Sequence, residues 1–120
     1  MIALLTALAG GVGAAGRFLV DTLVARHNRL GLPLGTVVVN ITACFLLGLL
    51  TGLLTHAAPS VLTSVLGIGF LGGYSTFSTA SVEGFRLLRD HRPWTALAHT
   101  GGMLVASLAA AALGLALAPG

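Results

Sequence analysis

Charged residues and cysteines are scarce in this chain of 120 residues. Only 8% of the residues are charged, whereas a soluble domain carries about a quarter. The single cysteine, Cys44, excludes an internal disulfide and a cysteine-built metal site. Lysine is absent, and most of the six basic residues, all arginines, lie in short segments between apolar runs. The net charge of +3 therefore reflects membrane topology, and we expect no nucleic-acid partner.

Apolar residues dominate instead, at 56% of the chain. A membrane-spanning helix needs about 20 such residues, and four apolar runs cover about residues 2–24, 33–54, 61–88 and 94–118. With the short loops between them they account for residues 1–120 and predict a single transmembrane domain, an all-α fold of four helices in a lipid bilayer. Because no basic residue precedes the first run, we expect a retained span and not a signal peptide.

The third apolar run contains a polar stretch, residues 69–83, which reads GFLGGYSTFSTASVE. Unpaired hydroxyl and backbone groups are costly in hydrocarbon, so this stretch must be shielded by protein or line a wet cavity. Its glycines and hydroxyls also predict a helix break after Gly72, with carbonyl and amide groups freed for a ligand. The alternative is an ordinary small-residue face for helix packing.

Two other spans carry isolated polar side chains. Arg17 and Asp21 have the spacing of an ion pair on one helix face; alternatively, the arginine extends to the lipid headgroups or attracts anions to a vestibule. Asn40 lies in the middle of the second span, where an unbonded amide is costly. It either bonds another helix or donates N–H groups to a passing anion.

Two further expectations concern the ends of the third and fourth spans. Glu83 is near the membrane edge and is expected to pair with Arg86. Ser107 shares a helix face with His99 and Met103, and its hydroxyl is expected to bond a carbonyl one turn back.

Four motifs then carry a family resemblance. They are GGVGAAGRF at 10–18, GTVVVN at 35–40, FLLG at 45–48, and GGYSTFST at 72–79 followed by Glu83. In this order they resemble the fluoride channel family called CrcB or Fluc. The resemblance implies a non-enzymatic four-helix protein that dimerises antiparallel in the bacterial inner membrane. Its two pores export fluoride passively and relieve fluoride toxicity, and a structural sodium ion lies at the dimer centre.

The same resemblance assigns residues to the pore. Phe77 matches a pore phenylalanine and Asn40 the pore asparagine. Ser78 and Thr79 supply hydroxyls, and Ser107 belongs to the polar track of the fourth span. These groups suit fluoride, because a pore must replace the ion's water with donors, and an aromatic ring is electropositive at its edge.

The resemblance also implies a vestibule and an ion site. Arg17 matches the vestibule arginine, and Gly72 and Ser75 match the positions whose backbone carbonyls hold sodium. The sequence departs from the family pattern most clearly at Ala80, where the family has a second phenylalanine. Ala43 replaces a glycine, which is a milder change.

Two other classes of membrane protein have the same size. A small proton-coupled multidrug exporter needs a carboxylate in mid-membrane, but Asp21 lies near the end of its span and Glu83 lies close to a loop. A non-transporting membrane subunit that assembles with larger partners is the other alternative.

The arginines predict the orientation. With four spans, the first and third loops share one side of the membrane; they hold Arg26 and Arg29, and Arg86, Arg89 and Arg92. The termini and residues 56–60 hold none. Because basic short loops stay in the cytoplasm, both termini are predicted outside. An antiparallel homodimer would need a balanced distribution, so we favour a heterodimer with a second four-span subunit; a homodimer is the alternative.

Overall fold

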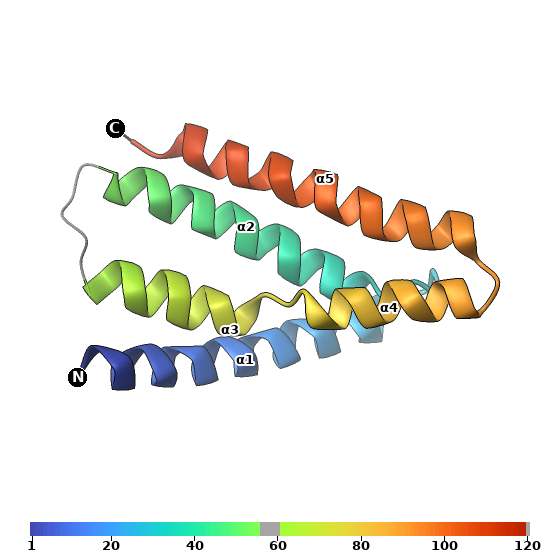
Figure 1. Cartoon of the computed structure of the whole chain (residues 1–120), viewed down its shortest axis with the longest axis horizontal. Helices are drawn as coiled ribbons and strands as arrows, with labels where there is room; N and C mark the ends of the chain where they lie inside the picture. The colour runs from blue at the N-terminus through green and yellow to red at the C-terminus, as the bar shows by residue number, and fades with distance from the viewer. Residues whose placement is uncertain (56–60, 120) are drawn as a thin grey trace.

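The computed structural model describes residues 1–55 and 61–119, and its regular structure there is helical throughout (Figure 1). The predicted all-α fold is confirmed, and α1, α2 and α5 are long and apolar enough to cross a membrane. The chain is therefore a multi-pass membrane protein. The predicted turn at residues 56–60 lies outside the described residues. The elements are α1 (Ile2–His27), α2 (Leu34–Leu54), η1 (Thr63–Leu71), α3 (Gly72–Tyr74), α4 (Ser78–Arg89) and α5 (Pro93–Leu117).

The third apolar run is a broken helix, as predicted. It begins as the π-helix η1, continues without interruption through α3, opens at residues 75–77 and resumes as α4 (Figure 1). The position predicted for the break, after Gly72, was wrong by a few residues. The Ser75 N–H still donates to the Leu71 carbonyl at 2.9 Å, so helical bonding persists up to Ser75.

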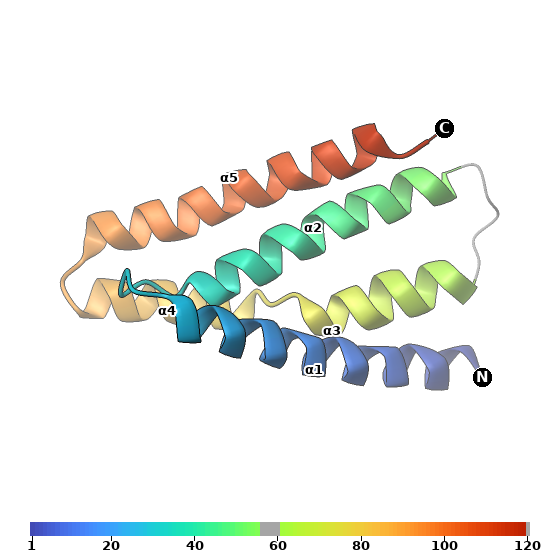
Figure 2. The same cartoon turned by 180° about the vertical axis from the view of Figure 1, so that it is seen from behind.

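Glycines allow close contact within two sets of helices. In Figures 1 and 2, α1 runs beside η1 and α3, whereas α2 runs beside α5. A Cβ atom on Gly13 of α1 would overlap the carbonyl oxygen of Phe70, and one on Gly48 of α2 would overlap that of Ala111. The absence of side chains at these glycines allows backbone to approach backbone, as small residues do in membrane bundles.

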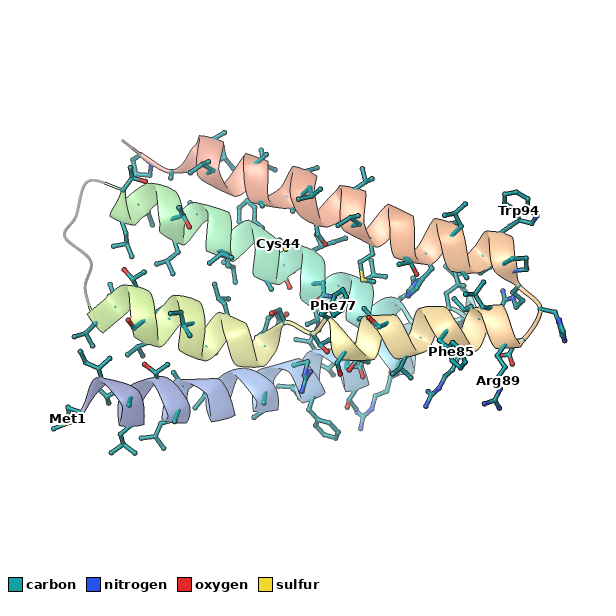
Figure 3. All side chains as sticks on the ribbon, in the orientation of Figure 1. Met1, Cys44, Phe77, Phe85, Arg89 and Trp94 are labelled. Atoms are coloured by element: carbon teal, nitrogen blue, oxygen red, sulfur yellow. The ribbon has the colours of Figure 1, made fainter. Side chains whose placement is uncertain are left out.

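Most large apolar side chains point away from the bundle. Figure 3 shows Trp94 extending outward, and Phe77, Phe85 and Trp94 are 88%, 63% and 80% exposed. Val39 is the one large side chain that is fully buried among the described residues. In a bilayer the outward surface contacts lipid or another subunit, so the protomer needs only a small core of its own.

Candidate functional site

Asn40 of α2 forms hydrogen bonds with the backbone at the break in the third span. Its Nδ2 donates to the Thr76 carbonyl at 2.8 Å, and its Oδ1 accepts from the Thr76 N–H at 2.9 Å. The amide thus makes the interhelical bond that its mid-span position required. Nδ2 has a second contact, to the sulfur of Met103 at 3.5 Å, and a thioether is only a weak acceptor.

These bonds free two carbonyl groups in the break. In a continuous helix the Thr76 N–H would donate to the Gly72 carbonyl and the Thr79 N–H to the Ser75 carbonyl. Here the Thr76 N–H donates to Asn40 and the Thr79 N–H donates to the Thr76 hydroxyl at 3.1 Å. Gly72 and Ser75, the two predicted sodium positions, therefore lose their usual helical donors.

A groove of about 350 Å³ opens beside the break, between α2, α4 and α5. It brings together the predicted residues Asn40, Ser75, Phe77 and Ser107. The hydroxyl of Ser107 is buried and has no hydrogen-bond partner within the described residues. The expected bond to a carbonyl one turn back is therefore not formed, because this side chain lies along the groove. The other lining residues are Cys44, Thr76, Ala80, Ser81, Thr100, Met103 and Leu104.

Two residues of the groove differ sharply in exposure, Phe77 and Ala80. The ring of Phe77 is 88% exposed, although it lies in the middle of the third span. Ala80, where the resemblance implied a second phenylalanine, is 8% exposed and presents only a methyl group to the groove.

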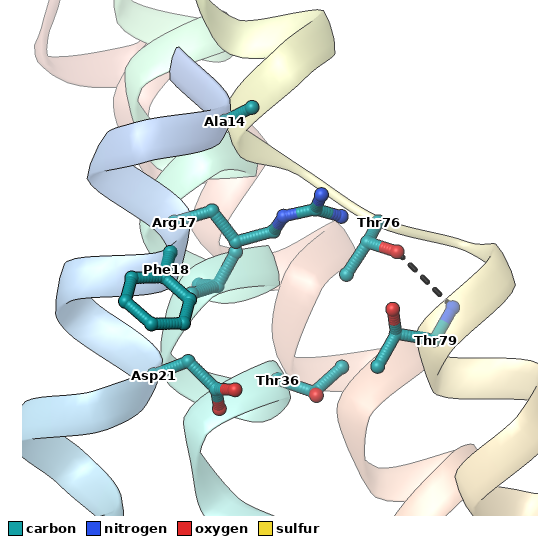
Figure 4. A pocket seen from close by; sticks show the side chains of 8 residues that line it. Ala14, Arg17, Phe18, Asp21, Thr36, Thr76 and Thr79 are labelled. Carbon is teal, nitrogen blue, oxygen red and sulfur yellow. Dashed lines mark hydrogen bonds between the residues drawn. The ribbon is translucent and has the colours of Figure 1, made fainter. Parts of the chain in front are cut away.

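A second cavity, of about 210 Å³, lies on the other side of the break, against α1 (Figure 4). The guanidinium of Arg17 extends across it toward Thr76, and Thr79 lies opposite. The ion pair expected between Arg17 and Asp21 is not formed among the described side chains. The Asp21 carboxylate instead packs against Gly35 of α2. The remaining lining residues are Ala14, Phe18, Thr36 and Val39.

Thr76 lines both the groove and the second cavity, so the break lies between the two. The sequence interpretation did not assign this residue a role. The available signal was its position three residues before Thr79 at a helix start, because an N-cap hydroxyl accepts from an N–H at that spacing. Two predicted residues, Ser78 and Gly72, line neither cavity and lie on the exposed surface of the protomer.

Glu83 also has different partners from those expected. The Thr36 hydroxyl donates to its Oε1 at 2.8 Å, and Nε2 of His99 lies 3.7 Å from its Oε2. The expected pair with Arg86 is not formed in the described part of the chain. Arg86 lies on the exposed face of α4, whereas Glu83 borders the inward face that Gly84 and other buried residues form.

Comparison with known proteins identifies the family. Residues 4–115 match the family described as CrcB-like protein, Camphor Resistance (CrcB). The chain is 43% identical over 116 residues to Fluoride-specific ion channel FluC 1 of Leifsonia xyli, covering 96% of this chain and 85% of that protein. It is 44% identical over 119 residues to FluC 2 of Cutibacterium acnes, covering 98% and 97%. It is 47% identical over 107 residues to FluC 2 of Mycobacterium tuberculosis, covering 89% and 82%. The chain therefore belongs to the CrcB family.

Proposed function

We propose that this chain is a subunit of a fluoride-specific ion channel, and not an enzyme. In the bacterial inner membrane it lets fluoride leave the cytoplasm passively, which relieves fluoride toxicity. One observation carries the proposal: the groove at the break gathers the Asn40 amide, the Phe77 ring and the partnerless Ser107 hydroxyl. The names of the similar proteins support the same ion.

The groove suits a small anion because its donors are weakly engaged. Nδ2 of Asn40 faces only a thioether with its second N–H, and the Ser107 hydroxyl has no partner in the described chain. The positive edge of the Phe77 ring adds an attractive wall. Fluoride that loses water on entry regains donors from these groups.

A second subunit completes each groove. The exposed ring of Phe77 and the exposed Ser78 beside it lie where an antiparallel four-span partner would cover the break. The one-sided arginine distribution favours a heterodimer over a homodimer. Arg17 and Thr79, in the cavity across the break, form the vestibule that attracts the anion.

A structural sodium ion fits the carbonyl groups of Gly72 and Ser75. Their helical donors are engaged by Asn40 and Thr76, so both oxygens are left to bind another partner. In residues 1–55 and 61–119, no group of three His, Cys, Asp or Glu side chains could hold a metal ion. Neutral carbonyl ligands suit a monovalent ion, and Gly72 is exposed on the surface that a partner would cover.

Fluoride efflux from proteoliposomes tests the proposal. We expect Asn40→Ala and Phe77→Ala to reduce efflux strongly and to leave the protein assembled. Phe85→Ala is the matched control, because this ring is also exposed but lies about two turns further along α4 and does not line the groove at the break. Unchanged efflux in both test variants contradicts the assignment. Proton-driven transport of an organic cation without fluoride flux would support a multidrug exporter instead.

A further inference from the structure

Glu83, His99 and Thr36 form a buried polar layer that joins α4, α5 and α2. The side chain of His99 is 2% exposed and that of Glu83 is 15% exposed. Thr36 bonds one carboxylate oxygen. The other oxygen and Nε2 of His99 are 3.7 Å apart, and neither has a hydrogen-bond partner within the described residues. Buried polar atoms without partners are costly, so this layer is expected to take up a water molecule, an ion or a proton.

The layer continues the polar face that lines the groove. On α5, His99, Met103 and Ser107 follow one another at four-residue spacing, and all three are buried. Met103 contacts Asn40 and Ser107 lines the groove. Along this face of α5, His99 is the next polar side chain beyond the groove, on the side of Pro93 and the third loop, which is rich in arginine.

The charge of this layer depends on one proton. The titratable groups facing Glu83 are His99 from α5 and Asp21 from α1, and α2 contributes only the hydroxyl of Thr36. With a neutral imidazole, Glu83 and Asp21 repel an anion whenever both carboxylates are ionised. With an imidazolium beside it, the charge of Glu83 is compensated. Coulomb interactions in a partly buried site are strong enough to change the local concentration of an ion.

We propose that His99 sets the charge of the anion path: fluoride passes readily when the imidazole is protonated beside Glu83, and slowly when it is neutral. This inference rests on the proposed fluoride channel function. It makes His99 a flux-determining residue and Glu83 the group that positions it. Flux is expected to rise as the pH falls, because an imidazole gains its positive charge at lower pH.

The first test is fluoride efflux from proteoliposomes at symmetrical pH values, with the leak of protein-free liposomes subtracted. We expect efflux to increase several-fold from about pH 8 to about pH 5.5, and His99→Gln to remove this dependence. His27→Gln is the matched control, because this histidine lies exposed at the end of α1, beside the Leu23 carbonyl. It should keep the pH profile of the parent protein.

A second measurement does not need the variant to fold. Nitrogen NMR of the labelled, assembled protein follows the protonation of each imidazole in sodium fluoride and in sodium chloride. If fluoride prefers the protonated layer, linkage requires fluoride to raise the titration midpoint of His99 and leave that of His27 unchanged. An unshifted His99 midpoint overturns the inference.

The two proposals fail in different ways. Fluoride efflux with a flat pH profile, or a pH profile that His99→Gln retains, overturns only the role of His99. Absence of fluoride efflux at every pH overturns the channel function and this inference with it.

Discussion

At the scale of the residue, Thr76 joins the two halves of the third span. Its backbone bonds the amide of Asn40, and its hydroxyl accepts from the first turn of α4. One residue therefore acts at both ends of the break: its backbone where α3 stops and its hydroxyl where α4 starts. Thr76 is 9% exposed, so water cannot easily replace these bonds.

Thr76→Val should lower stability by about 1 kcal/mol, because the methyl group cannot accept the Thr79 N–H. It should also reduce fluoride efflux, since α4 would no longer begin in a fixed position. Thermal unfolding and efflux measure the two effects. Thr51→Val makes the same chemical change at a hydroxyl that only bonds the Leu47 carbonyl of its own helix. Equal effects at the two positions would argue against a special role for Thr76.

Some of these residues could be predicted from the sequence alone. Asn40 was conspicuous because a mid-span amide must bond something, and Arg17 because a charge in a span needs a polar setting. The partners of Glu83 and Asp21 could not be predicted. Which side chains meet across helices depends on how each helix rotates about its axis, and pairs within one helix, such as Glu83 with Arg86, gave the wrong answer.

At the scale of the element, backbone contact through glycine determines how the helices pair. Gly13 allows α1 to touch the carbonyl of Phe70, whereas a Cβ on Gly11 would meet nothing within 4 Å. The two glycines lie two residues apart on one helix, so comparing an alanine substitution at each separates the effect of helix packing from that of helix propensity.

Gly13→Ala should destabilise the protomer by on the order of 1–3 kcal/mol, because the added methyl group forces α1 away from η1. Gly11→Ala should be neutral or slightly stabilising, since alanine favours the helix. Thermal unfolding in detergent or lipid compares the two variants. A loss of stability from Gly11→Ala as large as that from Gly13→Ala would contradict the proposed packing.

The spans were easier to predict than their irregularities. Apolar run length identifies a membrane helix directly, since the thickness of the bilayer fixes it. The break was placed too early because glycine content suggested that the helix stops at Gly72. A glycine can remain helical, and the helix ends where Asn40 takes the Thr76 N–H, a contact made 36 residues away in the chain.

At the scale of the whole molecule, the proposed sodium site makes assembly depend on a cation. Replacing sodium by a large organic cation should abolish fluoride efflux or dissociate the proposed dimer, because the carbonyl oxygens of Gly72 and Ser75 would lose their bound cation. Efflux measurements and light scattering in the two buffers distinguish these outcomes. Unchanged efflux and an intact dimer without sodium would argue against the site.

The orientation of the chain is the second prediction at this scale. All five arginines outside the first span lie in or beside the first and third loops, so the chain should insert with both termini outside. A C-terminal reporter that is active only in the cytoplasm should give no activity, and one that is active only outside should give high activity. Equal signals from both reporters would contradict a fixed orientation, and efflux by this chain purified alone would contradict the need for a heterologous partner.

The pairing of helices has a consequence for biosynthesis. The largest interface of α1 is with η1 and that of α2 is with α5, so each early helix packs mainly against a segment that follows later in the chain. When the first two helices enter the bilayer, Gly13 and Gly48 face lipid and have no backbone to contact. The hairpin of α1 and α2, which has a contact of its own between Asp21 and Gly35, can therefore complete its packing only after the later helices have inserted.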